Sequence, residues 1–360
     1  MLRVSDFGGT TVDYLIMLLS VQQARRIRVI ENILVNKRTV ATLFWGMRYQ
    51  ILPWLGYRRK VSRRQFDIAW QNLLDAGLIT IVEQQAQLTA RGEAQQRQFY
   101  STHYQPRYQA AYLLMNVDQV IQRLLLATQV VSEYSYESRQ YAPFSFNDDD
   151  LRAVKQWFTH QNKAQLVLTY KQELADFLAT LTDEEADFMV SQFIGHEVAG
   201  EALTQLADRL AMDVETARLM QYDLFAGLAQ YGLQLKSGAL YQLIAPMSSL
   251  TPMSNSAAQT YTLFQQRLSI QQISRTRRLK IGTVREHLLE AAIFEGANFP
   301  YDWVLSSSQQ TQLATRYGDE QIDHWQFQEQ ETDTADAFFY FRLYQIMRSF
   351  ISSDDHTGTD

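Results

Sequence analysis

The chain has 360 residues, 46% of them hydrophobic and 20% charged, which is typical of a globular protein of about two to three domains. It contains no cysteine, which excludes disulfides, cysteine-ligated zinc and iron–sulfur clusters within the chain. With only 15 glycines and 6 prolines, the composition favours long helices over a turn-rich sandwich or barrel.

The net charge of −6 hides an uneven distribution along the chain. Residues 25–64 hold 11 lysines and arginines and one acidic residue, whereas residues 301–360 hold 3 basic and 11 acidic residues. This asymmetry predicts a local basic face and an acidic tail.

The N-terminal segment does not have the pattern of a secretory signal. Asp6 and Asp13 interrupt it, and no small-residue cleavage site follows. The apolar run at residues 14–19 is much shorter than the roughly 20 residues that span a bilayer. We therefore expect a cytoplasmic protein with no membrane partner.

Residues 11–35 have the spacing of an amphipathic helix, and residues 38–55 predict a buried helix that Pro53 and Gly56 end or kink. The next segment predicts a winged helix-turn-helix. Its helix begins at a capping box of Ser62 and Gln65. Its apolar stripe consists of Phe66, Ala69, Trp70, Leu73 and Leu74.

Gly77 is a good stop signal for this helix, and a small hairpin is expected to follow. Its strands are Leu78–Val82 and Gln87–Thr89. The module either binds nucleic acid or is a helix packed on a hairpin without any such role. Five basic residues at its helix start are candidate DNA or partner contacts: Arg58, Arg59, Lys60, Arg63 and Arg64.

Residues 107–180 predict helices with an interruption near residues 141–147. The acidic runs that start at Asn147 and Thr182 precede helices, where they satisfy free N–H groups and the helix dipole. A catalytic carboxylate cluster is the alternative interpretation of each run.

Residues 201–229 resemble a second helix-turn-helix in their spacing, with a turn at Met212 and Asp213. Its second helix offers only Arg218 as a base, beside Asp213 and Glu215. Since a phosphate-binding surface should be more basic, we interpret this unit as structural or protein-binding.

A polar linker with Pro252 occupies residues 248–256. The chain is therefore expected to be mainly α, with several helix-turn-helix units and one small winged hairpin near the N-terminal third. The expected domains are a winged-helix-like domain (1–105), a helical middle domain (106–247), a helix-turn-helix domain (253–350) and a disordered acidic tail (351–360).

The most specific pattern lies at residues 257–296. Ser269 and Gln272 form a capping box for the second of three short helices, and Leu279 fills the turn before the third. The inward set is Tyr261, Phe264, Leu268, Ile270, Ile273, Val284, Leu288 and Ala291, and the core is closed by Phe338, Phe341 and Leu343.

A recognition helix reads the major groove from its N-terminal turns, so this segment supplies candidate DNA-binding residues. Those expected at phosphates, with side chains pointing away from the core, are Arg275, Arg277, Arg278 and Lys280. Those expected at bases or a partner are Thr283, Arg285 and His287. The alternative is a solvated basic turn on a packing domain.

The segment LSIQQISRTRRLKIGTVREHLLEAAIFEG (268–296) resembles the helicase helix-turn-helix domain. That domain ends some RecQ-type helicases and occurs in stand-alone YpbB-like proteins of Gram-positive bacteria. DAFFYFRLYQIMR (336–348) is similar to the helix that closes the domain. KRTVATLFWGMRYQILPWLGYRRKVSRRQFDIAWQNLL (37–74) is similar to the start of YpbB-like proteins.

The resemblance implies a non-enzymatic accessory or adaptor of a RecQ-type DNA helicase, with DNA and the helicase as partners. The pattern departs from a simple phosphate-binding surface, because Gly282 starts the third helix and Glu286 and Glu290 are expected to point outward. The acidic tail would repel DNA and suit a basic partner instead. A DNA-binding transcription regulator, acting as a symmetric dimer, is the alternative function.

The sequence lacks motifs of several enzyme classes. There is no G-x-x-x-x-G-K-[ST] loop and no G-x-S-x-G nucleophile elbow. His196–Glu197 matches half of the H-E-x-x-H zinc motif, but Gly200 stands at the second histidine position. We expect no catalytic residues, no metal and no cofactor.

Overall fold

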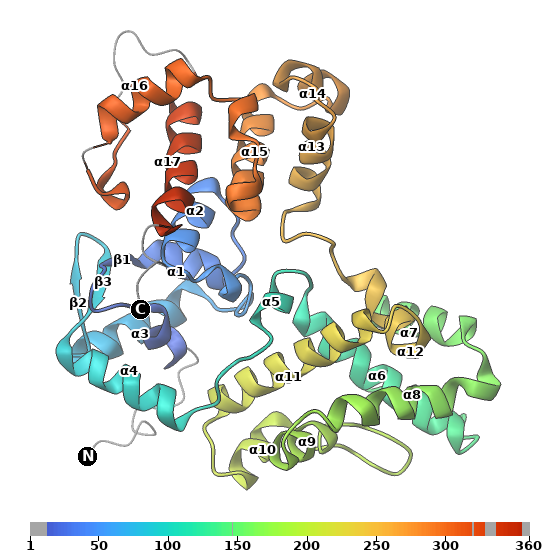
Figure 1. Cartoon of the computed structure of the whole chain (residues 1–360). Helices are drawn as coiled ribbons and strands as arrows, with labels where there is room; N and C mark the ends of the chain where they lie inside the picture. The colour runs from blue at the N-terminus through green and yellow to red at the C-terminus, as the bar shows by residue number, and fades with distance from the viewer. Residues whose placement is uncertain (1–12, 146, 319, 328–335, 355–360) are drawn as a thin grey trace. The chain divides into compact units, whose positions relative to one another are not determined.

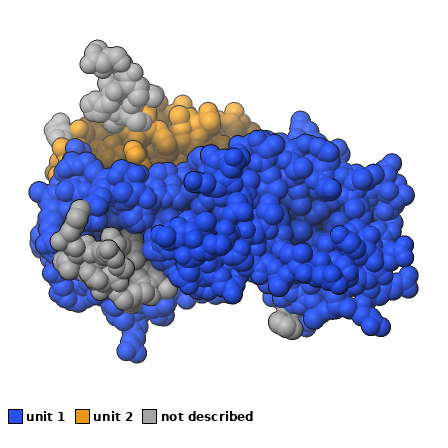
Figure 2. Space-filling view, turned by 90° about the horizontal axis from the view of Figure 1, so that it is seen from below, with its two compact units in different colours: residues 1–36, 53–250 blue, residues 37–52, 251–360 orange. Residues whose placement is uncertain are grey.

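The computed structural model describes residues 13–145, 147–318, 320–327 and 336–354. Within them, helices dominate and the one sheet has three short antiparallel strands (Figure 1), which confirms the mainly α class with a small hairpin. The chain forms two compact units, coloured separately in Figure 2. Unit 1 comprises residues 1–36 and 53–250, and unit 2 comprises residues 37–52 and 251–360.

Unit 1 begins differently from the expected single helix at residues 11–35. A 3-10 helix spans Asp13–Leu18, a strand β1 spans Arg25–Arg26, and α1 spans Ile27–Leu34. The prediction failed because Arg25 and Arg26 adopt extended backbone and pair with a distant strand. The apolar residues of this segment are nevertheless buried, as the periodicity indicated.

The expected hairpin is present. After α3 (Arg63–Asp75), β2 (Ile79–Val82) and β3 (Gln85–Leu88) pair antiparallel, and β1 joins them in the order β1-β3-β2. Both turn residues, Glu83 and Gln84, have positive φ, as a tight two-residue hairpin turn requires. Leu74, expected in the apolar stripe of α3, is instead 38% exposed.

The rest of unit 1 is helical, with the break at residues 141–147 that the sequence predicts. Its helices are α4 (Ala90–Thr102), α5 (Gln109–Tyr112), α6 (Val117–Ser135), α7 (Asp148–His160), α8 (Lys163–Leu178), α9 (Asp183–Val190), α10 (Leu203–Arg209), α11 (Val214–Gln234) and α12 (Gly238–Ile244). Asn147 and Thr182 cap α7 and α9 as expected. Asp150 of the first acidic run pairs with Arg123 at 2.8 Å, which is a structural role.

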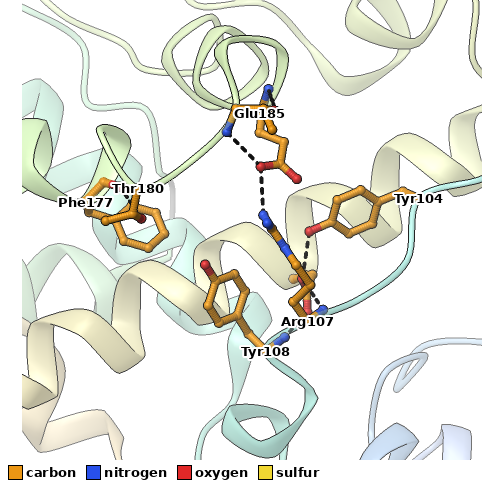
Figure 3. A network of polar contacts seen from close by, with 8 residues as sticks. Tyr104, Arg107, Tyr108, Phe177, Thr180 and Glu185 are labelled. Atoms are coloured by element: carbon orange, nitrogen blue, oxygen red, sulfur yellow. Dashed lines mark hydrogen bonds and ion pairs between the residues drawn. The ribbon is translucent and has the colours of Figure 1, made fainter.

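A buried carboxylate on α11 holds the segment before α5. Asp223 is fully buried and accepts hydrogen bonds from the Tyr104 and Tyr112 hydroxyls (2.7 and 2.6 Å) and from the backbone N–H groups of Arg107 and Tyr108 (2.8 and 2.9 Å). The Arg107 guanidinium in turn donates to Glu185 at 2.7 Å (Figure 3). Because all these donors converge on one buried acceptor, this segment has a single arrangement within unit 1.

Unit 2 combines α2 (Val40–Arg48) with α13 (Asn255–Gln265), α14 (Ile270–Arg277), α15 (Ile281–Glu295), α16 (Ser307–Tyr317) and α17 (Ala337–Asp354). The domains expected from sequence put residues 38–55 in the N-terminal domain. In the structure α2 packs on α15 instead, and the Arg342 guanidinium of α17 lies 4.5 Å from the Phe44 ring. The C-terminal unit therefore includes a helix that lies about 200 residues earlier in the sequence.

Two further expectations concern the end of the chain. The helix α17 continues through Asp354, so residues 351–354, expected in a disordered tail, are helical. The remainder of that tail lies outside the described residues. Phe341 and Leu343 are buried as expected, whereas Phe338 is 48% exposed because it lies on the outer face of α17.

Candidate nucleic-acid interface

The three-helix motif of unit 2 is built as its sequence predicts. The side chains of Ser269 and Gln272 form the capping box at the start of α14. Arg278 adopts a left-handed conformation (φ 54°) that ends α14 and lets the chain turn into α15. Val284 and Leu288 of α15 are fully buried, which fixes the helix within unit 2, whereas Ile281 and Gly282 at its start are exposed.

Three of the predicted phosphate contacts lie on the exposed side of this motif. Arg275, Arg278 and Lys280 are exposed, and none forms an ion pair with another described residue. Arg275 lies in the last turn of α14, and Arg278 and Lys280 lie just before the N-terminus of α15, where free N–H groups and the helix dipole favour anions. A methyl group placed on Gly282 would meet no atom within 4 Å, so the backbone is open there to close approach.

Arg277 does not belong to this exposed group. Its guanidinium donates to the Ser256 carbonyl, the Thr260 hydroxyl and, at 2.9 Å, the Gln259 amide oxygen. The sequence-based expectation that Arg277 points away from the core is therefore wrong. Arg277 ties α14 to α13 because it lies in the last turn of α14, on the side that faces α13.

We expect Arg277→Ala to destabilise unit 2 by about 1.5–3 kcal/mol, the usual cost of removing hydrogen bonds made by a charged group. Arg275→Ala is the control, since this neighbouring arginine is exposed and touches none of these partners. Urea denaturation of both variants measures the difference. Equal stability of the two variants would contradict the assigned role of Arg277.

The residues expected at bases are turned mostly toward protein. Arg285 pairs with Asp336, and its guanidinium lies 5.7 Å from the Phe339 ring. The His287 imidazole shares a hydrogen bond of 2.8 Å with the Thr260 hydroxyl. Burial and the neighbouring Arg277 guanidinium lower the pKa of His287, which favours its neutral form. Thr283 is half-buried.

Glu290 was expected to point outward, and this expectation is also wrong. It is 7% exposed and accepts hydrogen bonds from Arg38 (2.8 Å), from the Ser254 N–H (2.7 Å) and from the Ser254 hydroxyl (3.1 Å). Helical spacing placed it on a free face because the sequence could not show that residues 37–52 cover that face of α15. Glu286, by contrast, is exposed as expected.

The basic segment near α3 does not form one outward patch. Arg58 pairs with Glu215, and Arg63 pairs with the buried Glu31 and with Asp67. Arg64 is exposed. Arg59 and Lys60 line a cavity in unit 1 together with Arg218, which the sequence suggested only as part of a structural unit.

Sequence reasoning missed one feature of the exposed face. Ile281, the first residue of α15, is 38% exposed beside the open Gly282, so the leading turn of α15 presents small and apolar groups between the cations. Its position at the first turn of a recognition-type helix was the available signal.

Membrane spans and metal sites are both absent from the described parts of the chain. Among these residues, no helix is both long and apolar enough to cross a membrane. Within the same ranges, no three histidine, aspartate or glutamate side chains are grouped as metal ligands would be.

Comparison with known proteins bears out the resemblance noted in the sequence. A family model for a helix-turn-helix domain matches residues 256–344. The chain is also similar to protein YpbB of Bacillus subtilis (strain 168), with 24% identity over 287 residues that cover 78% of this chain and 80% of that protein. No solved structure matches the chain.

Proposed function

We propose that this protein is a non-catalytic, DNA-binding accessory of a RecQ-type DNA helicase. The observation that carries the DNA part is the group of Arg275, Arg278 and Lys280, which lie exposed and without ion pairs to described residues around the open N-terminus of α15. The matched helix-turn-helix model covers all three residues. The helicase part rests on the resemblance to the helicase helix-turn-helix domain and YpbB-like proteins.

The proposed binding mode tolerates different DNA sequences. Phosphate contacts add affinity without reading bases, and the three exposed cations suit phosphates. Arg285 and His287, the best candidates for base contacts, are engaged with Asp336 and Thr260. This arrangement favours the accessory role over a transcription regulator, which must distinguish base sequences.

The test is a triple variant, Arg275→Ala/Arg278→Ala/Lys280→Ala, measured by fluorescence anisotropy with duplex DNA over a salt series. We expect binding to weaken equally for unrelated sequences. The slope of log K against log salt should become shallower by about 0.9 for each phosphate that the variant no longer neutralises. Arg139→Ala/Lys155→Ala/Lys171→Ala removes the same charge from exposed sites in unit 1 and is the control.

A triple variant that keeps wild-type affinity would show that this face does not bind DNA. Strong discrimination between sequences by the wild-type protein would favour the regulator instead. The helicase part is tested separately by affinity capture from the native host after nuclease treatment, where recovery of a RecQ-type helicase is the expected result. Its absence from the captured material would leave only the DNA-binding part of the proposal.

A further inference from the structure

Unit 1 contains a cavity of about 770 Å³, which is within the range of small-molecule sites. It lies between the segment that leads into α3, the first half of α6, the start of α10 with the loop before it, and the first half of α11. All of its lining residues belong to unit 1.

Cations gather in one corner of this cavity. Four basic residues line it: Arg58, Arg59, Lys60 and Arg218. Arg58 and Arg218 both pair with Glu215, but neither Arg59 nor Lys60 forms an ion pair with any described residue. The acidic lining residues are Glu201, which is held by Arg209 at 3.0 Å, and Asp118, which interacts electrostatically with all four cations. The corner thus carries more positive than negative charge.

Several polar atoms in the wall lack partners. The hydroxyls of Tyr57 and Tyr222 and the Nε atom of Arg59 are buried without a hydrogen bond to any described residue. Both tyrosines are at most 5% exposed. Since buried polar groups are normally paired, three such atoms in residues that line one cavity are unusual.

Other lining residues have a different character. Phe144, Ile194 and Leu203 offer apolar surface, and the side chain of Gln122 makes no hydrogen bond with any described residue. A ligand that fits must carry negative charge at one end and a flat, partly apolar body with hydrogen-bonding groups at the other. Inorganic phosphate is much smaller than the cavity, whereas a nucleotide matches both the size and the chemistry.

We propose that this cavity binds a nucleotide, with its phosphates against Arg59 and Lys60 and its base along the wall that contains Phe144. The nucleotide is either free or the 5′-phosphorylated end of a DNA strand, because both present the same group to the cationic corner. The site is separate from the DNA contacts proposed for unit 2 and does not depend on them.

The test uses the full chain and isothermal titration calorimetry with ATP, AMP and two oligothymidylates that differ only in a 5′-phosphate. We expect ATP, the 5′-phosphorylated oligonucleotide, or both to bind. Arg59→Gln/Lys60→Gln should weaken that binding at least tenfold, because it removes two charge-assisted contacts to phosphate. Arg139→Gln/Lys155→Gln makes the same change of charge at exposed positions that do not line the cavity and should leave it unaltered.

Lys60→Gln alone is the control for a folding defect in the double variant, because Lys60 is exposed and forms no ion pair or side-chain hydrogen bond with a described residue. It should weaken binding several-fold with an unchanged melting temperature. The two kinds of probe distinguish the natural ligand. Binding of ATP indicates a free nucleotide, and preference for the phosphorylated oligonucleotide indicates the end of a DNA strand. Binding of neither probe would overturn the proposal. So would wild-type affinity in both Lys60→Gln and the double variant.

Discussion

Replacing Glu290 by Ala is expected to destabilise unit 2 by about 3–5 kcal/mol, the range for removing one member of a buried ion pair. The carboxylate satisfies the Arg38 guanidinium together with the Ser254 N–H and hydroxyl, and its side chain is 9% exposed. Without it, Arg38 stays largely buried beside the Phe294 ring with no carboxylate opposite its charge. The loss of folding free energy comes mainly from this buried charge, which no longer has a partner.

Glu286→Ala is the matched control for this prediction. It removes the same group from the same helix one turn earlier, where the side chain is exposed. We expect a change within about 0.5 kcal/mol, as for most surface substitutions. Hydrogen exchange of α13 and α15 peptides, with urea denaturation of the whole chain, measures both variants. Similar stability of the two would show that Glu290 does not hold α2 and α13 to α15.

Phe44→Ala is expected to have an effect of similar size, about 3–5 kcal/mol, because a fully buried ring is replaced by a cavity. The ring belongs to α2, which packs on α15, and the Arg342 guanidinium of α17 lies against it. The destabilisation should therefore appear in unit 2, although Phe44 lies far from most of that unit in the sequence. Faster hydrogen exchange in α15 and α17 is the expected observation.

Phe338→Ala provides the comparison, since this phenylalanine also lies near Arg342 but is 48% exposed. This substitution should destabilise unit 2 markedly less. A fragment of residues 253–350, which the sequence alone suggests as a domain, lacks both Phe44 and Arg38. We expect that fragment to be poorly folded until a peptide of residues 37–52 is added. A fragment as stable as unit 2 in the full chain would contradict this dependence.

The Glu290 and Phe44 variants matter for the DNA proposal because they separate stability from contact. The exposed cations Arg275, Arg278 and Lys280 depend on α15 being held in place, so Glu290→Ala should weaken DNA binding only as far as unit 2 unfolds. At temperatures where the variant remains folded, its affinity should approach that of the wild type. The triple basic variant should instead bind DNA more weakly while keeping its stability.

Local features of this protein were predictable from the amino-acid sequence alone. The sequence predicts the capping boxes at Ser62 and Ser269, the hairpin after α3 and the inward face of α15. Each of these features depends on residues only a few positions apart in the chain. The similarity of residues 256–344 to a helix-turn-helix domain could also be predicted, because its pattern lies in one continuous segment of the chain.

Which faces of those helices are free depends instead on contacts between distant segments. Helical spacing places Arg277, Arg285 and Glu290 on outward positions, yet each is paired with α13, with Asp336 or with Arg38. The pairing of α2 with α15 and of β1 with β3 joins segments far apart in the chain. Likewise, Arg59 and Arg218 meet at one cavity although about 160 residues separate them. Such contacts form because burial favours apolar and charged surfaces that fit together. The periodicity of a segment shows which of its faces is apolar, but not which distant segment packs against that face.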